Sequence, residues 1–205
     1  MSDLVFYTNP MSRGRIVRWM LEEVGVSYQT KVLDYAEVKA PEFLTINPMG
    51  KMPTIVHGTT VVTEAAAICA YLADAFPAAG LAPPPNDRGA YYRWLFFAAG
   101  PLEAAMTNQA LGVAVPPERR RMAGYGCMED VLQTIETALA EREYCAGDAF
   151  SAADVYLGSG LGFGLMFGSI ERRPVFERYV GALQARPAAV RAREIDDALI
   201  AAAKA

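Results

Sequence analysis

The sequence predicts a small α/β domain followed by an all-α domain, and three observations support this prediction. Over residues 1–76, short apolar runs of strand length alternate with segments of helical periodicity. Residues 77–87 are rich in proline, which together with glycine interrupts both periodicities and indicates a linker. Over residues 88–205 the pattern is helical throughout.

The start of the chain predicts a strand, a helix and a second strand. An apolar strand at residues 4–7 is followed by a turn at residues 8–12 and by a helix that ends at Val24, with Gly25 as its C-cap. Residues 27–33 form the second strand, which gives a parallel crossover unit. Apolar residues share one face of the helix, and the opposite, polar face carries Arg15, Arg18, Glu22 and Glu23.

The next stretch contains the features that point most clearly to chemistry. A glycine-marked turn leads into a strand that begins at Pro53, and a hairpin, a second strand at residues 60–63 and a helix follow. If the Met52-Pro53 peptide bond is cis, the main-chain N–H and C=O of Met52 point outward and can pair with an extended peptide. Most X–Pro bonds are trans, so spacing alone leaves this point open.

Glu64 stands at the corner where the second of these strands meets the helix. Its carboxylate lies beside N–H groups that the first helical turn leaves unpaired, which suits an amino-acid-like ligand. A glutamate in a first turn also interacts favourably with the helix dipole, so a purely structural role is the alternative.

The helical part begins with an aromatic helix expected at residues 87–111, which Pro101 should kink. Ser151 and Asp154 form a capping box, which indicates a buried helix start far more than it indicates chemistry. The other helices are expected at residues 118–142, 174–185 and 188–203.

Composition argues against several classes of protein. With 205 residues, of which 53% are hydrophobic and 20% charged, the chain can bury a sizeable core. The net charge of −4 and the shortness of the arginine runs argue against nucleic-acid binding. Three widely spaced cysteines favour a reducing, cytoplasmic compartment, and a single histidine argues against a histidine-based zinc site, so no metal is expected. The uncharged residues 155–170 are too few to span a membrane.

Ser12 and Asn9 stand where the first strand turns into the first helix. The main-chain N–H groups and the helix dipole at this point favour an anion, and they lower the pKa of a thiol bound beside them. A hydroxyl there can donate a hydrogen bond to the thiolate. Serine and asparagine are also the commonest N-caps, so a structural role for Ser12 is the alternative.

Several motifs, taken in order, resemble the cytosolic glutathione S-transferase family, with a catalytic segment of the bacterial, serine type. Residues 6–18, which contain Pro-Met-Ser, look like that segment. Residues 39–53 are similar to the region of the glycyl carboxylate and the cis-proline, and residues 63–68 to the family's Glu-Ser-x-Ala-Ile. The resemblance covers essentially the whole chain and implies a thioredoxin-like domain over residues 1–76 and a helical-bundle domain over residues 88–205.

The resemblance implies roles for individual residues toward glutathione, the co-substrate. Ser12 would hydrogen-bond the sulfur, and because some branches of the family place this residue three positions earlier, Asn9 is the second candidate. The main chain of Met52 would pair with the cysteinyl unit, beside a cis Pro53.

The ends of glutathione would be held by other residues. Glu64 would accept from the γ-glutamyl ammonium, and the Ala65 N–H would meet the γ-glutamyl carboxylate. Lys39 and Lys51 would lie toward the glycyl carboxylate. Ala65 replaces the family's usual serine, which removes one hydroxyl contact.

The second substrate implied by the resemblance is a small apolar electrophile, whose site the helical domain would line. The candidate residues are apolar or aromatic: Tyr92, Phe96, Phe97, Met106, Phe163 and Phe167. Glycines near residues 158–168 suit either an adaptable wall of that site or close helix packing. The resemblance also implies a homodimer. Three functions follow: conjugation of glutathione, another glutathione-dependent reaction such as isomerisation or peroxide reduction, and a non-catalytic module for binding and dimerisation.

Overall fold

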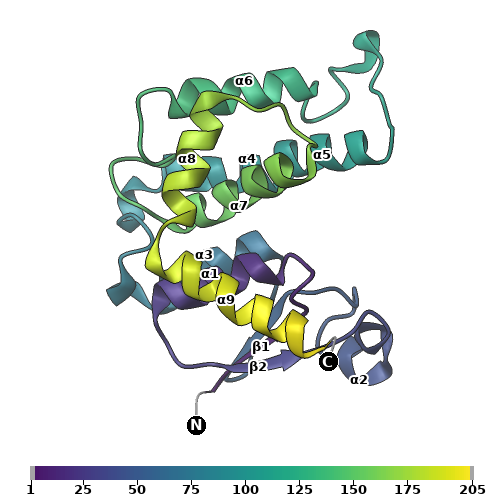
Figure 1. Ribbon diagram of the computed structural model, residues 1–205, viewed down its shortest axis with the longest axis vertical. Coiled ribbons are helices and arrows are strands. Elements are labelled where there is room, and N and C mark those ends of the chain that lie inside the picture. Colours follow the sequence, from purple (N-terminus) through teal and green to yellow (C-terminus); the bar gives the residue numbers. More distant parts are fainter. Residues whose placement is uncertain (1–2, 204–205) are drawn as a thin grey trace. The chain divides into compact units, whose positions relative to one another are not determined.

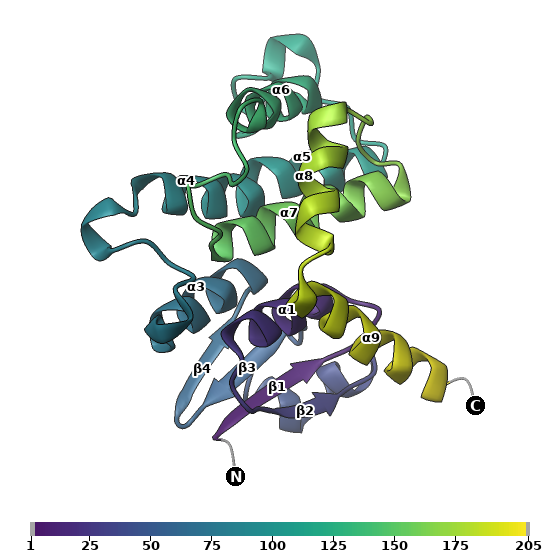
Figure 2. The same ribbon diagram turned by 60° about the vertical axis from the view of Figure 1, so that its left-hand side comes forward.

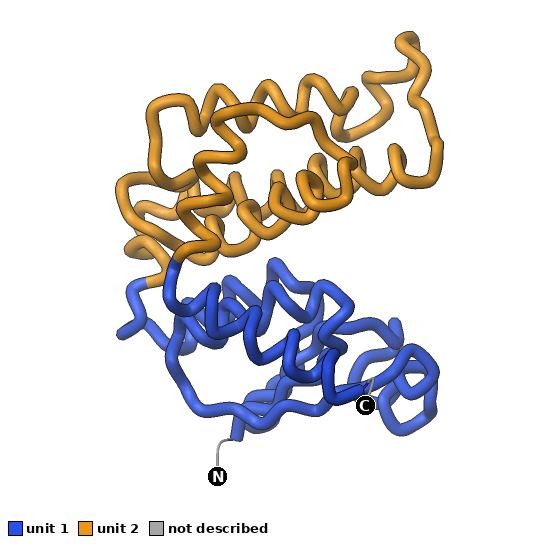
Figure 3. Tube along the Cα trace, in the orientation of Figure 1, with its two compact units in different colours: residues 1–80, 186–205 blue, residues 81–185 orange. Residues whose placement is uncertain are grey.

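The computed structural model describes residues 3–203. The chain divides into two compact units, which Figure 3 colours separately. Unit 1 contains the residues up to Gly80 together with those from Arg186 onward, and unit 2 contains Leu81–Ala185.

Unit 1 is built around a four-stranded mixed sheet of thioredoxin-like topology (Figure 1). The strand order is β2-β1-β3-β4, with β1 parallel to β2 and β3 antiparallel to both of its neighbours. The elements follow one another in the predicted order: β1 (Leu4–Thr8), α1 (Gly14–Val24), β2 (Gln29–Val32), α2 (Pro41–Leu44), β3 (Thr54–His57), β4 (Thr60–Thr63) and α3 (Ala65–Ala75).

Strand β1 contributes to the core on both faces of the sheet. Phe6 is fully buried on the face that α1 covers, where the guanidinium carbon of Arg18 lies 5.1 Å from the centre of its ring. Tyr7, the next residue, contacts Phe43 of α2, with ring centroids 5.5 Å apart. Because successive side chains of a strand point to opposite faces, α1 and α2 cover opposite sides of the sheet.

The last helix, α9 (Pro187–Ala202), also belongs to unit 1 and packs along α1 (Figure 2). This differs from the expectation that residues 88–205 form one helical domain. The physical reason is that α9 covers the polar side of α1, where the buried Arg18 pairs with the buried Asp196. That side of α1 is therefore largely an interface between helices.

Unit 2 is helical, as predicted. Pro101 lies in a π-helical turn, Ala98–Leu102, that separates the two halves of the expected helix at residues 87–111. The helices are α4 (Gly89–Phe97), α5 (Glu103–Ala110), α6 (Met128–Leu139), α7 (Ala152–Phe167) and α8 (Pro174–Gln184).

The helix expected at residues 118–142 is shorter than predicted, because α6 begins only at Met128. The preceding segment starts with a short 3₁₀ turn, Pro117–Arg119. Further along, Gly126 adopts a φ of 67°, in the left-handed region that a right-handed helix does not use. The chain therefore turns at Gly126 before a regular helix starts.

Helix α7 confirms the predicted capping box, and at least one of its glycines serves close helix packing. The Ser151 N–H donates to Asp154 Oδ2 at 2.9 Å, and Asp154 is fully buried. A Cβ on Gly158 would lie 2.5 Å from Leu183 of α8, so this glycine permits close helix packing. Within residues 3–203, no helix combines the length and the apolar character needed to cross a bilayer.

Candidate functional site

Three segments of unit 1 meet at one end of the sheet. Tyr7 of β1 pairs with Thr54 of β3, and Thr54 pairs with Thr63 of β4. Since β3 runs antiparallel to both neighbours, the chain leaves β1, enters β3 and leaves β4 at the same end. The structure therefore brings together the segments that contain the candidate residues Asn9, Ser12, Met52, Pro53, Glu64 and Ala65.

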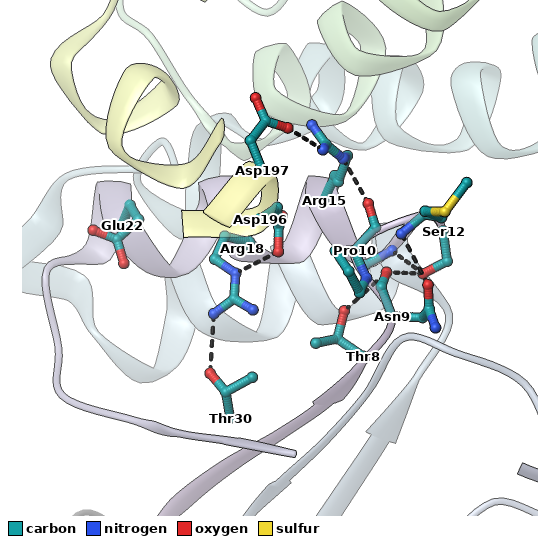
Figure 4. A network of polar contacts seen from close by, with 12 residues as sticks. Thr8, Asn9, Pro10, Ser12, Arg15, Arg18, Glu22, Thr30, Asp196 and Asp197 are labelled. Atoms are coloured by element: carbon teal, nitrogen blue, oxygen red, sulfur yellow. Dashed lines mark hydrogen bonds and ion pairs between the residues drawn. The ribbon is translucent and has the colours of Figure 1, made fainter. Parts of the chain in front are cut away.

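The β1–α1 loop (residues 9–13) is held by hydrogen bonds to its own carbonyl groups (Figure 4). The Asn9 carbonyl accepts from the Ser12 N–H at 3.1 Å and from Ser12 Oγ at 2.7 Å. The Pro10 carbonyl accepts from Arg15 Nε at 2.7 Å. The Met11 carbonyl accepts from the Tyr35 hydroxyl at 3.3 Å. These bonds fix the path of the main chain that presents Ser12.

Ser12 lies just before the helix and is not its N-cap. Helix α1 begins at Gly14, and the residue at the N-cap position is Arg13. Ser12 Oγ nevertheless accepts from the Gly14 N–H at 3.0 Å, so it satisfies one N–H at the start of the helix. A Cβ on Gly14 would collide with the Thr8 hydroxyl, which explains how the helix starts so close to the end of β1.

Asn9 uses both polar atoms of its side chain to hold the loop. Its Nδ2 donates to the Leu33 carbonyl, just after β2, at 2.9 Å, and its Oδ1 accepts from the Met11 N–H at 2.9 Å. The Ser12 hydroxyl is less tightly bound into the loop. The Asn9 carbonyl to which it donates also accepts from the Ser12 N–H. The Ser12 hydroxyl can therefore turn toward another acceptor without leaving that carbonyl unpaired.

The Met52-Pro53 peptide bond is cis, as the sequence reasoning considered. Within residues 3–203, the main chain of Met52 forms no hydrogen bond, and Met52 is half-buried just before β3. The turn before it is fixed by Asn47, whose Nδ2 donates to the Lys51 carbonyl at 2.9 Å and to Thr54 Oγ1 at 3.1 Å. The Met52 N–H and C=O are thus available to an extended partner.

Glu64 has an unusual backbone. Its φ of 65° and ψ of 115° lie in a region that residues other than glycine rarely adopt, and in residues 3–203 it is the one non-glycine residue with a positive φ. The side chain is exposed, and Ala65 behind it is buried and starts α3. Backbone strain of this kind is found preferentially at binding and catalytic sites, which supports a role for Glu64.

The two lysines lie beside these segments. Lys39 ends a short 3₁₀ turn and donates from Nζ to the Met49 carbonyl at 2.8 Å, so its ammonium is held over the turn before Met52. Lys51 is exposed in that turn, while its carbonyl accepts from Thr54 Oγ1 at 3.2 Å. Both side chains leave a positive charge near the same end of the sheet.

The six candidates for an apolar site are carried by three helices of unit 2: Tyr92, Phe96 and Phe97 by α4, Met106 by α5, and Phe163 and Phe167 by α7. Phe96 and Phe167 are 73% and 77% exposed, and Tyr92 is also exposed. The other three are half-buried, and the ring of Phe97 packs edge-on against Trp94 at 5.3 Å. Exposed aromatic side chains of this size are candidates for binding surfaces.

Sequence reasoning missed the contribution of α9 to this region. Arg15 donates from Nε to the Pro10 carbonyl and forms an ion pair with Asp197 of α9 (Figure 4). The neighbouring Arg18 pairs with Asp196. The available signal was the spacing, because arginines three apart on one helix match two consecutive aspartates in an alanine-rich helix at the end of the chain.

Two of the three cysteines are poorly suited to act as thiolates. Burial raises the pKa of the Cys69 and Cys145 thiols well above their usual range. All three cysteines are free. Within residues 3–203, no three His, Cys, Asp or Glu side chains cluster as a metal site would require.

Comparisons with known proteins agree with the architecture. Residues 2–74 match the family model described as the N-terminal domain of glutathione S-transferase. Glutathione S-transferase F10 of Arabidopsis thaliana is 31% identical over 147 residues, which cover 66% of this chain and 68% of the relative. Glutathione S-transferase 2 of Anopheles gambiae is 30% identical over 179 residues, which cover 82% of this chain and 84% of the relative.

A solved structure extends the likeness to nearly the whole chain. It is that of a sphingomonad glutathione S-transferase complexed with glutathione, which is 29% identical, with a TM-score of 0.78, and the match covers 94% of this chain and 98% of that one. Sequence relatives and the structural match thus agree over both units. The chain belongs to the glutathione S-transferase family.

Proposed function

We propose that this chain binds glutathione at the end of the sheet described above and transfers the glutathione thiolate to a small apolar electrophile. The observation that carries the proposal is the row formed by Tyr7, Thr54 and Thr63, which gathers three separate segments with complementary polar groups. Membership of the family supports it, as does the likeness to the sphingomonad protein complexed with glutathione.

Ser12 is the favoured hydrogen-bond donor to the glutathione thiolate. In the proposed complex its hydroxyl turns from the Asn9 carbonyl to the sulfur, and the Ser12 N–H keeps that carbonyl paired at 3.1 Å. The Gly14 N–H, 3.0 Å from Oγ, polarises the hydroxyl. Together with the dipole of α1, this bond stabilises the thiolate over the thiol and so supplies the nucleophile. Asn9 is the second candidate, because its Nδ2 has another hydrogen to donate.

The remaining contacts follow the shape of a tripeptide. The free main-chain N–H and C=O of Met52, before the cis Pro53, would pair with the cysteinyl unit. The Glu64 carboxylate would accept from the γ-glutamyl ammonium, and the Ala65 N–H at the start of α3 would hold the γ-glutamyl carboxylate. Lys39 and Lys51 would face the glycyl carboxylate.

The electrophile would contact the exposed aromatic residues of unit 2, of which Phe96 and Phe167 are the most exposed. An apolar compound becomes more soluble in water when glutathione is attached to it. The proposed role is therefore detoxification, and the proposed compartment is the cytoplasm. A homodimer is part of the proposal, with the Met49 turn and α3 as its interface, and Met49 is 65% exposed. Size-exclusion chromatography checks the dimer, which elution at the mass of one chain would contradict.

The experiment that tests the function begins with calorimetry of glutathione binding. A panel of model electrophiles is then assayed with glutathione and the wild type, Ser12→Ala and Asn9→Ala. Loss of a charge-assisted hydrogen bond should lower kcat/KM by about 10- to 100-fold in Ser12→Ala. Ser27→Ala, an exposed serine outside the β1–α1 loop, is the matched control and should retain activity. Unchanged conjugation in both loop variants would contradict the mechanism.

One alternative function has a specific observation in its favour, and the other glutathione-dependent reactions share the proposed glutathione site. Ala65 lacks the hydroxyl of the family's usual serine, which favours a binding module, and no calorimetric signal at roughly millimolar glutathione, the weak end of measurable affinity, would select it. The unassigned electrophile leaves isomerisation and peroxide reduction as glutathione-dependent alternatives. Exchange through a protein disulfide is disfavoured, because burial raises the pKa of Cys69 and Cys145.

A further inference from the structure

We infer that Asp197 of α9 is a positioning residue for the β1–α1 loop and that it acts through Arg15. The inference deepens the proposed function, since it rests on Ser12 as the residue that meets the glutathione sulfur. It assigns to the end of the chain a role in fixing the loop that presents Ser12.

Arg15 connects the two elements with one rigid group. Its Nε donates to the Pro10 carbonyl at 2.7 Å, and its Nη2 donates to Asp197 Oδ1 (Figure 4). Within residues 3–203, Arg15 Nε is the one donor to the Pro10 carbonyl. Because a guanidinium is planar, the carboxylate that fixes one edge of the group also fixes the direction of the other donor.

The pair differs in one respect from the other ion pairs between α1 and α9. Glu23 pairs with Arg186, Glu22 with Arg191 and Arg18 with Asp196. Neither the Glu22–Arg191 pair nor the Arg18–Asp196 pair has a hydrogen bond to the β1–α1 loop among the described residues, whereas the Arg15 pair does. Arg191 and Glu22 therefore offer a matched comparison on the same two helices.

Two further hydrogen bonds attach the loop to the rest of unit 1. The side-chain amide of Asn9 donates to the Leu33 carbonyl, and the Tyr35 hydroxyl donates to the Met11 carbonyl. Both hydrogen bonds connect the loop to the segment after β2. Loss of the Arg15 bond would release the Pro10 carbonyl, which accepts from no other described residue. Ser12 follows Pro10 by two residues and would move with it.

The position of Asp197 separates this role from a general structural one. Its side chain is 57% exposed, and exposed ion pairs contribute little to global stability. Removing the Asp197 carboxylate should therefore leave the free energy of unfolding nearly unchanged and should alter the conformation of the β1–α1 loop. Catalysis is sensitive to such a change, since a small misplacement of a reacting group lowers the rate more than it lowers binding.

The test uses the full chain with Asp197→Ala, Arg15→Ala, the double variant and Arg191→Ala as control. Hydrogen exchange of the amides of residues 11–14 is measured first, without ligand. The apparent pKa of bound glutathione is then measured by ultraviolet titration of its thiolate, together with kcat and KM. We expect about fivefold faster exchange at residues 11–14 in both single variants, which is the factor for one lost hydrogen bond.

The expected kinetic result is a higher pKa of bound glutathione and about tenfold lower kcat, with KM little changed. The double variant should match Arg15→Ala alone, because Asp197 acts only through Arg15. Asp197→Glu should restore the wild-type values, and Arg191→Ala should leave both the exchange and the pKa unchanged.

The inference would be overturned by wild-type exchange at residues 11–14 in Asp197→Ala, or by equal effects of Asp197→Ala and Arg191→Ala. Additive effects in the double variant would overturn the route through Arg15. Failure of the wild type to bind glutathione would refute the proposed function instead, and the amide exchange would still decide whether Asp197 and Arg15 hold the loop.

Discussion

Arg18 Nε lies 3.0 Å from Asp196 Oδ1, and each of these side chains is only 1% exposed. Burial raises the pKa of the Asp196 carboxyl, and the charge of Arg18 opposes this effect. Arg18 also donates to Thr30 Oγ1 and to the Tyr28 hydroxyl, yet its Nη2 and Asp196 Oδ2 have no partner among the described residues. The pair is therefore a buried contact between α1 and α9 with unfulfilled hydrogen-bonding capacity.

Breaking this pair should destabilise the protein strongly, and replacing it should not. Arg18→Met or Asp196→Leu alone leaves one buried charge unpaired and should lower the free energy of unfolding by about 3–5 kcal/mol. The double variant Arg18→Met/Asp196→Leu removes both charges and should recover most of that loss. Urea unfolding of the three variants measures this, and a double variant as unstable as the sum of the two singles would contradict it.

Asp154 should be the most sensitive polar residue of unit 2. Its carboxylate accepts from the Cys145 N–H at 2.7 Å, from the Tyr179 hydroxyl at 2.7 Å and from Ser151 N and Oγ at 2.9 and 3.0 Å. Asp154→Ala leaves these buried donors unpaired and should lower the free energy of unfolding by more than about 3 kcal/mol. Ser151→Ala removes the cap and one of the four donors to Asp154, and should cost only about 1 kcal/mol. Thermal and urea unfolding compare the two.

Glu64 should separate stability from binding. Its positive φ costs a residue with a side chain about 1 kcal/mol or more, and glycine avoids this strain. Glu64→Gly should therefore be at least as stable as the wild type and should bind glutathione about tenfold more weakly, because the acceptor for the ammonium is lost. Glu64→Gln keeps the strained backbone and serves as control: it should lose affinity without gaining stability. Calorimetry and urea unfolding give both quantities.

Ala65→Ser should strengthen glutathione binding. The substitution adds a hydroxyl in the first turn of α3, where the proposed γ-glutamyl carboxylate lies, and one hydrogen bond corresponds to about a two- to tenfold gain in affinity. Ala66→Ser, one residue further along the same turn, is the control and should leave affinity unchanged. Equal affinities of Ala65→Ser and the wild type in calorimetry would argue against this placement of the carboxylate.

Tyr28 should make stability fall at alkaline pH. Burial raises its pKa to about 12; the bond from Arg18 opposes the rise, and the bond to Glu22 adds to it. In the unfolded chain a tyrosine has a pKa of about 10, so the unfolded state loses the proton first. Stability is therefore unaffected by this group below about pH 10 and decreases as the pH rises from about 10 toward about 12. Tyr28→Phe should show a smaller decrease in urea unfolding over this range.

The sheet of unit 1 could be predicted from local patterns because its strands are short and separated by clear turns. Gly25 ends α1 in the left-handed conformation that the sequence indicates, and β4 has the predicted bounds. The helix expected from residue 118 does not begin there, because the chain turns at Pro117 and Gly126. The effect of these two residues exceeds that of the apolar periodicity. Glycine and proline were the most informative local signals in this chain.

The candidate site was predictable in part, for a physical reason. Ser12 and Glu64 lie at junctions between elements, which a linear pattern marks. The position of α9 could not be predicted from its own periodicity, which does not distinguish a helix that packs on α5 from one that packs on α1. The carboxylates of Asp196 and Asp197 find their partners in arginines from the other end of the chain, and such long-range pairing is absent from local sequence.

The return of α9 to unit 1 has a consequence for biosynthesis. A ribosome that has delivered β1 through α3 must still translate all of Leu81–Ala185 before it makes the helix that covers α1. Until then, the nascent sheet carries an uncovered flank around Arg18, which is the side chain that most needs an anionic neighbour. Maturation of the amino-terminal part of unit 1 is thus coupled to successful translation of the intervening helices, even though that part already contains β1 to β4.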